Sequence, residues 1–200
     1  MSSVLSRIPA ATLRCFPGSG LFSLCCLLFL STPLLVLAEG YESDVMKEAL
    51  KGDPQSQFAL ALLYEYGTEN IERNPEKSVG LLTAAAKRGV SGACLYLGLK
   101  YEHGTGVKQD SAKAVCWYSC AARQGWSSAQ FFLARLYELG KGVPKSTLTA
   151  LAWLSLAAES GYPGAEEEFV RLQRETGFND HGQVQSRRKQ LLEESGTPCN

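Results

Sequence analysis

The side chains that could carry chemistry in this 200-residue chain are few and scattered. There are two histidines, His103 and His181, and neither has a second ligand at the spacing that a zinc site needs. His103 stands near the expected end of a helix, where the carbonyl terminus stabilises a cation. The acidic run at 166–168 is typical of the first turn of a helix, not of a paired-carboxylate site. We therefore expect no catalytic residue, no metal and no cofactor.

Two short motifs match enzyme signatures only in part. Gly104-Thr105-Gly106 has the glycine spacing of a phosphate-binding turn, but it follows an expected helix and no strand precedes it. Ser186 and Lys189 have the spacing of the serine–lysine pair of penicillin-recognising enzymes, yet the companion motifs Ser-Asp-Asn and Lys-Thr-Gly are absent from the sequence. The first motif is interpreted as a turn and the second as a chance match.

The cysteines divide between an early group and the rest of the chain. The N-terminal segment described next predicts export, and cysteines in an exported domain favour disulfides. Cys116 and Cys120 are i, i+4 neighbours on one helix face, and a bridge between them would be strained. Cys199 stands in a polar tail, where it is either free or engaged with another molecule. The early group is Cys15, Cys25 and Cys26, and the later group is Cys94, Cys116, Cys120 and Cys199.

An uncharged apolar run over residues 21–38 follows a basic segment and precedes acidic residues. This charge order, with a small residue at the end of the run, predicts a signal peptide over residues 1–38 that is cleaved after Ala38. The alternative is an N-terminal membrane anchor, because these 18 residues approach the length that spans a bilayer. In both cases the rest of the protein is exported, to the periplasm or outside the cell, and a bacterial envelope is the expected setting.

The charges of the whole chain cancel, with 20 basic and 20 acidic residues. This balance excludes a basic nucleic-acid-binding protein and an acidic disordered tail. Residues 1–38 contain two arginines and no acid, so the remainder carries 18 basic against 20 acidic residues. With 45% hydrophobic residues, the chain can bury a core.

One sequence pattern returns along the chain after 36 residues. Residues 91–126 align with residues 127–162, and an earlier copy over residues 53–90 has one extra residue in its loop. The segment 163–195 begins a fourth copy and then loses the pattern, as a capping repeat does, and includes a charged C-terminal helix. Residues 39–52 predict a leading cap helix, and residues 196–200 form a tail. Matched pairs in the central copies include Ala93/Ala129, Leu97/Leu133, Tyr101/Tyr137, Gly104/Gly140 and Trp117/Trp153.

Each copy predicts two helices. In the second copy, Ala93, Leu97 and Tyr101 recur at i, i+4 spacing along one helix face. Gly104 then ends this helix, because glycine adopts the left-handed conformation at little cost. Asp110 is placed to cap the helix that follows. A single copy cannot bury its apolar face, so the copies must stack on one another.

The pattern A-x-x-x-L-x-x-x-Y-x-x-G-x-G-V, then A-x-x-W, then A-A-x-x-G, resembles the Sel-one-like repeat, a relative of the tetratricopeptide repeat. The resemblance covers roughly residues 53–177. The first copy departs from it in the loop, and the fourth lacks the second-helix signature. The resemblance implies an all-α, right-handed solenoid of stacked helix–turn–helix repeats. It also implies binding of proteins or of cell-envelope polymers, and it does not imply an enzyme.

The same resemblance bears on the cysteines. In a cysteine-rich exported branch of the family, a disulfide joins the two helices of each repeat, and Cys94 occupies the first-helix position of that bridge. The partner position is Ala122, whereas the nearby cysteine is Cys120. Two residues along a helix are about 200° of rotation, so we expect Cys94 and Cys120 to face apart. A Cys94–Cys120 disulfide and two unpaired packing residues both remain open.

One row of first-helix positions lies outside the repeat signature and predicts a binding strip on the concave side of the stack. Six of its nine residues are large and apolar or aromatic, as interaction sites often are. Lys100 and His103 in its middle favour a ligand with some negative charge. The alternatives are that a C-terminal helix over residues 183–194 covers the strip, or that the strip packs between repeats. The strip consists of Ala59, Leu63, Tyr66, Tyr96, Lys100, His103, Phe132, Leu136 and Leu139.

These observations predict an exported repeat adaptor that binds a protein or peptide partner and no nucleic acid. It would meet a membrane only through an uncleaved N-terminus. The alternative is a cell-envelope enzyme, or a binder of peptidoglycan fragments with weak β-lactamase-like hydrolase activity, as the resemblance to cysteine-rich relatives implies. A third possibility is an adaptor of a eukaryotic secretory pathway, which the lack of a retention tetrapeptide at the end of the sequence disfavours.

Overall fold

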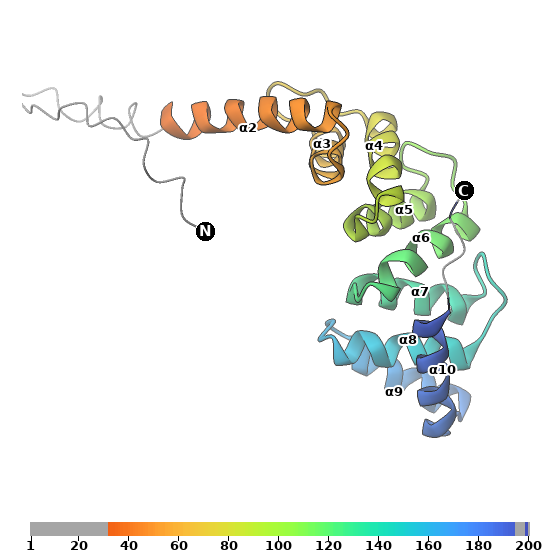
Figure 1. The fold of residues 1–200 in the computed structure, drawn as a ribbon. Coiled ribbons are helices and arrows are strands. Elements are labelled where there is room, and N and C mark those ends of the chain that lie inside the picture. Colours follow the sequence, from red (N-terminus) through yellow and green to blue (C-terminus); the bar gives the residue numbers. More distant parts are fainter. Residues whose placement is uncertain (1–31, 195–198, 200) are drawn as a thin grey trace, which may run out of the picture. The chain divides into compact units, whose positions relative to one another are not determined.

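The computed structural model describes residues 32–194 and 199, and in this part the chain forms helices joined by short turns, without a strand (Figure 1). The chain divides into two compact units, residues 1–41 and residues 42–200. The expected signal peptide or anchor over residues 1–38 falls largely outside the described residues. Within the described part, no helix is long and apolar enough to cross a membrane.

The repeats are consecutive pairs of helices. The first repeat is α3 and α4, the second α5 and α6, the third α7 and α8, and the all-α solenoid predicted from the sequence is confirmed. The leading helix α2 extends further toward the N-terminus than the cap helix expected over residues 39–52. The bounds are α2 Thr32–Leu50, α3 Pro54–Tyr66, α4 Pro75–Lys87, α5 Ser91–His103, α6 Ser111–Arg123, α7 Ser127–Leu139, α8 Thr147–Glu159, α9 Ala165–Thr176 and α10 His181–Glu193.

The second helix of each repeat begins at a polar side chain that caps it. Asn74 accepts a hydrogen bond from the backbone N–H of Lys77 at 2.9 Å, and Pro75 occupies the first helical position, where its missing N–H costs nothing. Asp110 accepts from two backbone N–H groups of α6, each at 3.0 Å. Ser146 accepts from the single backbone N–H of Thr149 in α8, at 3.2 Å. These caps determine where the second helix of each repeat starts.

Glycines in the turns allow neighbouring repeats to approach closely. Gly104 and Gly140 end α5 and α7 in the left-handed conformation, with φ of 73° and 68°. A Cβ at Gly106 would lie 2.6 Å from the backbone of Pro75, and one at Gly142 would lie 2.4 Å from the backbone of Ser111. The turn inside each of these repeats therefore packs against the start of the second helix in the preceding repeat.

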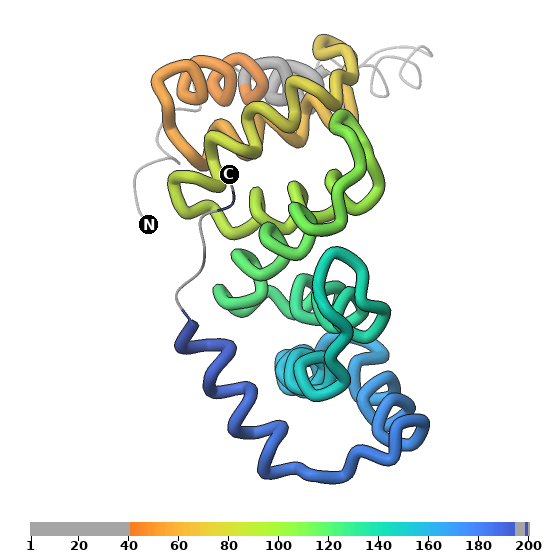
Figure 2. Tube along the Cα trace, turned by 90° about the vertical axis from the view of Figure 1, so that its right-hand side faces the viewer, coloured from red at the N-terminus to blue at the C-terminus, as the bar shows by residue number. Residues whose placement is uncertain are grey.

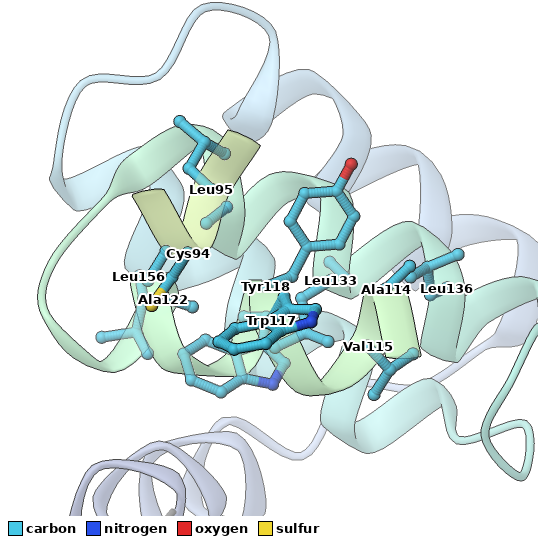
Figure 3. Close-up of a cluster of buried hydrophobic side chains, with 14 of the residues drawn as sticks. Cys94, Leu95, Ala114, Val115, Trp117, Tyr118, Ala122, Leu133, Leu136 and Leu156 are labelled. Carbon is cyan, nitrogen blue, oxygen red and sulfur yellow. The ribbon is translucent and has the colours of Figure 1, made fainter. Parts of the chain in front are cut away.

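The core lies between the two helices of each repeat and between successive repeats (Figure 3). The predicted stripe of α6, Ala114, Trp117 and Ala121, is buried, and so is Trp153 of α8. Alanine at two of these three positions lets the helices come close together, and the indole fills the space beside them. The core stripe expected from the sequence is confirmed.

The C-terminal helix covers a different face from the one considered as an alternative. α9 ends at Gly177 in the left-handed conformation, and α10 then packs against α8, the second helix of the third repeat. Figure 2 shows α10 running back along the stack toward the second repeat. Arg188 of α10 forms an ion pair with Glu159 of α8. The alternative that this helix covers the first-helix strip is therefore wrong, because the helix lies on the second-helix side.

The four later cysteines form two disulfides. Cys94 of α5 bonds to Cys120 of α6, with their Cα atoms 6.0 Å apart, and Cys116 bonds to Cys199. The expectation that Cys94 and Cys120 face apart is therefore wrong, because the two helices approach closely enough for the thiols to meet despite the rotation between positions 120 and 122. The expectation that Cys199 is free or intermolecular is also wrong, because Cys199 bonds to Cys116 of α6, the helix that the end of α10 also reaches.

Candidate interaction surface

Three residues of the predicted strip are exposed, one in each repeat. Tyr66, His103 and Leu139 are the last residues of α3, α5 and α7. The side chain of Tyr66 is 68% exposed and that of Leu139 is 53% exposed, and His103 is also exposed. This end of the predicted strip is available to a partner.

The middle of the strip is buried between repeats, which corrects the sequence-based prediction. Leu136 is 2% exposed, Lys100 is also buried, and Leu63 is half-buried in the cluster that α2 and α3 form. These residues occupy equivalent places in α7, α5 and α3. Leu136 and Lys100 are therefore closed to a partner, whereas Leu63 stays partly exposed.

Lys100 does not offer a positive charge to a ligand. Its ammonium group forms an ion pair with Glu65 of the preceding repeat, and the lysine side chain is 4% exposed. The expectation that Lys100 attracts a negatively charged ligand is wrong, because the carboxylate of Glu65 already compensates this charge. The Lys100–Glu65 pair does not involve His103, so the expectation that His103 favours a negatively charged ligand stays a prediction.

Tyr96 and Phe132, two further aromatic residues of the strip, are half-buried and pack against other aromatic rings. Tyr96 packs edge-on against Phe58 with the ring centroids 5.8 Å apart, and its hydroxyl is hydrogen-bonded to that of Tyr66, which raises the pKa of Tyr96. Phe132 packs against Tyr118, with centroids 5.5 Å apart. A substitution at Tyr96 or Phe132 therefore disturbs packing as well as the surface.

A hollow lies between the first helix of the third repeat and α9. It has a volume of about 380 Å³, and α7 and α9 contribute its walls. The ring of Phe131 stands 4.7 Å from that of Tyr162, centroid to centroid, which holds one wall in place. Its lining residues are Phe131, Arg135, Glu138, Leu139, Glu168 and Arg171. The three exposed helix ends and these lining residues are called the first-helix face below.

Of the six residues that line this hollow, the predicted strip contained only Leu139 and missed the other five, among them Phe131, Arg135 and Arg171. On α7 the predicted strip contained the buried Leu136 and omitted the neighbouring, exposed Arg135. Comparison of the copies shows a change at this position, because Leu62 and Leu99 stand where the third copy has Arg135. The change does not by itself indicate exposure, because Lys100 also stands where other copies have leucine and is buried.

The remaining chemistry-bearing side chains, the two histidines, Ser186 and Lys189, are all exposed. His181 is the first residue of α10, far along the chain from His103, and both are exposed. Ser186 is exposed on α10, and the ammonium group of Lys189 faces Glu193 at 3.9 Å. Among the described residues, no group of three His, Cys, Asp or Glu side chains is arranged to hold a metal ion.

Comparison with known protein families agrees with this architecture. A family model for the Sel1 repeat matches residues 54–90, 91–126 and 127–162, which are the three helix pairs. The chain belongs to the Sel1-repeat family. Proteins with Sel1 repeats are generally non-catalytic scaffolds that mediate protein–protein interaction, so the general class predicted from the sequence is supported.

Solved structures of other Sel1-repeat proteins have the same fold. This chain is similar to c5321, a protective antigen present in uropathogenic Escherichia coli strains that displays an SLR fold, with a TM-score of 0.65, 29% identity and 76% of this chain covered. The match spans 33% of that protein, so this Sel1-repeat chain corresponds to about a third of it. A Sel1 repeat protein from Oxalobacter formigenes has a TM-score of 0.60 and 34% identity, covering 64% of this chain and 96% of its own length.

Proposed function

We propose that this Sel1-repeat protein is an exported adaptor that binds a segment of another protein on its first-helix face. The observation that carries the proposal is the row of exposed residues at equivalent places in the three repeats: Tyr66, His103 and Leu139. Exposed aromatic and apolar side chains that recur along a rigid scaffold are typical of an interaction surface.

Export is supported by two independent features. The uncharged segment at 21–38 lies between basic and acidic residues, as in a signal peptide. The two disulfides, Cys94–Cys120 and Cys116–Cys199, persist best in an oxidising compartment such as a periplasm or the cell exterior. The mass of the protein purified from its native cells tests this part, since cleavage after Ala38 removes residues 1–38.

Site-specific photo-crosslinking tests the binding surface. A photoreactive amino acid replaces Tyr66, His103 or Leu139 in turn, and the protein is irradiated in the native cells. We expect the same partner to be crosslinked from all three positions, because they lie on one face. The matched control is Leu192, which is 50% exposed on α10, on the second-helix side.

The partner identified in this way is then purified and its affinity is measured. Tyr66→Asp and Leu139→Asp should each weaken binding at least tenfold, because a carboxylate opposes burial in an apolar contact. Leu192→Asp should leave the affinity unchanged. Phe132 and Leu136 are unsuitable for this test, because both contribute to packing between helices. Crosslinking from Leu192 in place of the three face positions contradicts the proposal.

A further inference from the structure

We infer that the hollow between α7 and α9 is an anchoring site for an extended protein segment in which a large apolar residue stands beside an acidic one. The apolar side chain enters the hollow against Phe131 and Leu139, and the neighbouring carboxylate pairs with Arg135. This inference rests on the proposed function, because the hollow is part of the first-helix face.

The two arginines that line the hollow differ in their acidic partners: Arg171 has several, and Arg135 has none among the described residues. Arg171 forms ion pairs with Glu138 at 2.9 Å, with Glu168 at 2.7 Å and with Glu175 at 2.6 Å. Hydrogen bonds from Arg171 to Glu138 and Glu168 raise the pKa of Arg171, so its guanidinium group stays charged. Both carboxylates that line the hollow are thus engaged by this one cation.

Arg135 is the other cation of the hollow, and its situation is different. It is exposed, and no acidic side chain in the described part of the chain lies within ion-pair distance of its guanidinium group. The acid nearest in sequence on its own helix, Glu138, already pairs with Arg171. A planar guanidinium group that is exposed and unpaired is well suited to bind a carboxylate through two parallel hydrogen bonds.

The apolar side of the hollow lies next to this cation. Leu139 is one turn along α7 from Arg135 and largely exposed, while Phe131 is one turn in the other direction. The volume of about 380 Å³ is at the lower end for small-ligand pockets and suits one large side chain. An apolar group beside a carboxylate therefore matches both the shape and the charge of this place.

The walls of the hollow are formed before a ligand arrives. The Glu138–Arg171 pair joins α7 to α9, and the Phe131–Tyr162 contact fixes the aromatic wall. Little ordering is therefore needed on binding, which favours affinity. The exposed row continues from Leu139 to His103 and Tyr66 in the preceding repeats, so the ligand is a stretch of chain that extends along these helices.

A defined peptide tests the inference with purified full-length protein. The probe is the fluorescein-labelled, C-terminally amidated peptide Gly-Ser-Glu-Leu-Glu-Phe-Glu-Ser-Gly, and fluorescence anisotropy reports its binding. Two further peptides carry Gln or Lys in place of every Glu. We expect the Glu peptide to bind at least tenfold tighter than the Gln peptide, and the Lys peptide to bind weakest. Added salt should reduce this difference.

The variant Arg135→Gln identifies the cation responsible. It should weaken the Glu peptide about tenfold and leave the Gln peptide unchanged, because only the carboxylate uses the guanidinium group. The matched control is Arg174→Gln, which removes the same charge from an exposed position of α9 outside the hollow. Thermal melting of both variants checks that the fold is retained.

Several outcomes overturn the inference. These are no saturable binding of the Glu peptide at millimolar concentration, equal affinity of the Glu and Gln peptides, or equal effects of Arg135→Gln and Arg174→Gln. Sedimentation that shows a dimer lost in Arg135→Gln assigns the hollow to a second copy and also overturns it. If crosslinks from Tyr66, His103 and Leu139 persist while the peptides fail, only this inference fails. If the crosslinks fail as well, so does the proposed function.

Discussion

Lys100 of α5 forms a buried ion pair with Glu65 of α3, and this pair joins the first repeat to the second. Equivalent places in the third repeat and in α9 are taken by Leu136 and Leu172, both buried. A charge therefore stands in a packing row where the following repeats use leucine, and a carboxylate from the neighbouring repeat compensates it. This pair makes the junction between the first two repeats different from the others.

Replacing Lys100 by methionine should destabilise the protein by about 3 kcal/mol, because the carboxylate of Glu65 stays partly buried without a partner. The double variant Lys100→Met with Glu65→Leu should recover most of this loss, since neither charge then remains. Urea unfolding at pH 7 gives the midpoints of both variants and of each single one. A double variant that is less stable than both single variants contradicts this account of the pair.

Gly98 of α5 lets the ring of Tyr118 lie directly against the helix backbone. A Cβ at this position would stand 2.4 Å from a ring carbon of Tyr118, a side chain that is itself fully buried. Gly98→Ala should therefore lower the free energy of unfolding by about 1–3 kcal/mol or more, because the ring has no room to move. Thermal or urea unfolding measures the change.

The matched control for Gly98 is Gly80, which lies inside α4, where an added Cβ would have no neighbouring atom within 4 Å. Gly80→Ala should raise the free energy of unfolding by about 0.5–1 kcal/mol, because alanine favours the helix more than glycine does. The two substitutions are chemically identical and should act in opposite directions. Equal effects would show that close packing of Tyr118 is not what matters at Gly98.

The fold follows from the sequence because its signals are local and recur in each repeat. Asp110 caps α6 and Gly104 ends α5 as predicted, since both depend only on the neighbouring backbone. The exposed residues are harder to predict from the sequence, because Arg135 and Leu136 differ by only about 100° around one helix. Which of the two faces the neighbouring repeat depends on how the helices stack, and a spacing of 36 residues contains no information about that angle.

The disulfides show a second limit of sequence reasoning. Cys116 and Cys199 are 83 residues apart, and they meet because α10 runs back along the stack. No local pattern near Cys199 indicates this path. Cys94 and Cys120 belong to one repeat, but the rotation between positions 120 and 122 was a poor guide, because the close approach of α5 and α6 matters more than the direction of one Cβ.

The Cys116–Cys199 bond should stabilise the protein by holding the C-terminal segment against the second repeat. Replacing both cysteines by alanine should lower the free energy of unfolding by about 4 kcal/mol, because a long loop is no longer closed in the unfolded chain. Urea unfolding under non-reducing conditions measures this loss. The comparison is the variant with alanine at Cys94 and Cys120, whose shorter loop should give about 3 kcal/mol.

A reductant provides the check on this disulfide. Dithiothreitol should lower the unfolding midpoint of the native protein more than that of either double variant, because each variant has one bond left to lose. If dithiothreitol shifts the native protein and the Cys116/Cys199 variant by the same amount, that bond contributes nothing to stability.

The hydroxyl of Tyr118 donates a hydrogen bond to Glu102 at 2.6 Å, and burial, with this bond and the charge of Glu102, raises the pKa of Tyr118 above its ordinary value of 10.0. The folded state therefore binds this proton more tightly than the unfolded chain does. The resulting stability is fully present below about pH 10 and is lost as the pH rises above it, because the unfolded chain then releases the proton and the folded protein does not.

Tyr118→Phe should cost about 1–2 kcal/mol at pH 7 and less at about pH 11. Urea midpoints at both values measure this, with Tyr41→Phe, which is exposed, as the control. A difference between native protein and Tyr118→Phe that grows with pH contradicts the assignment.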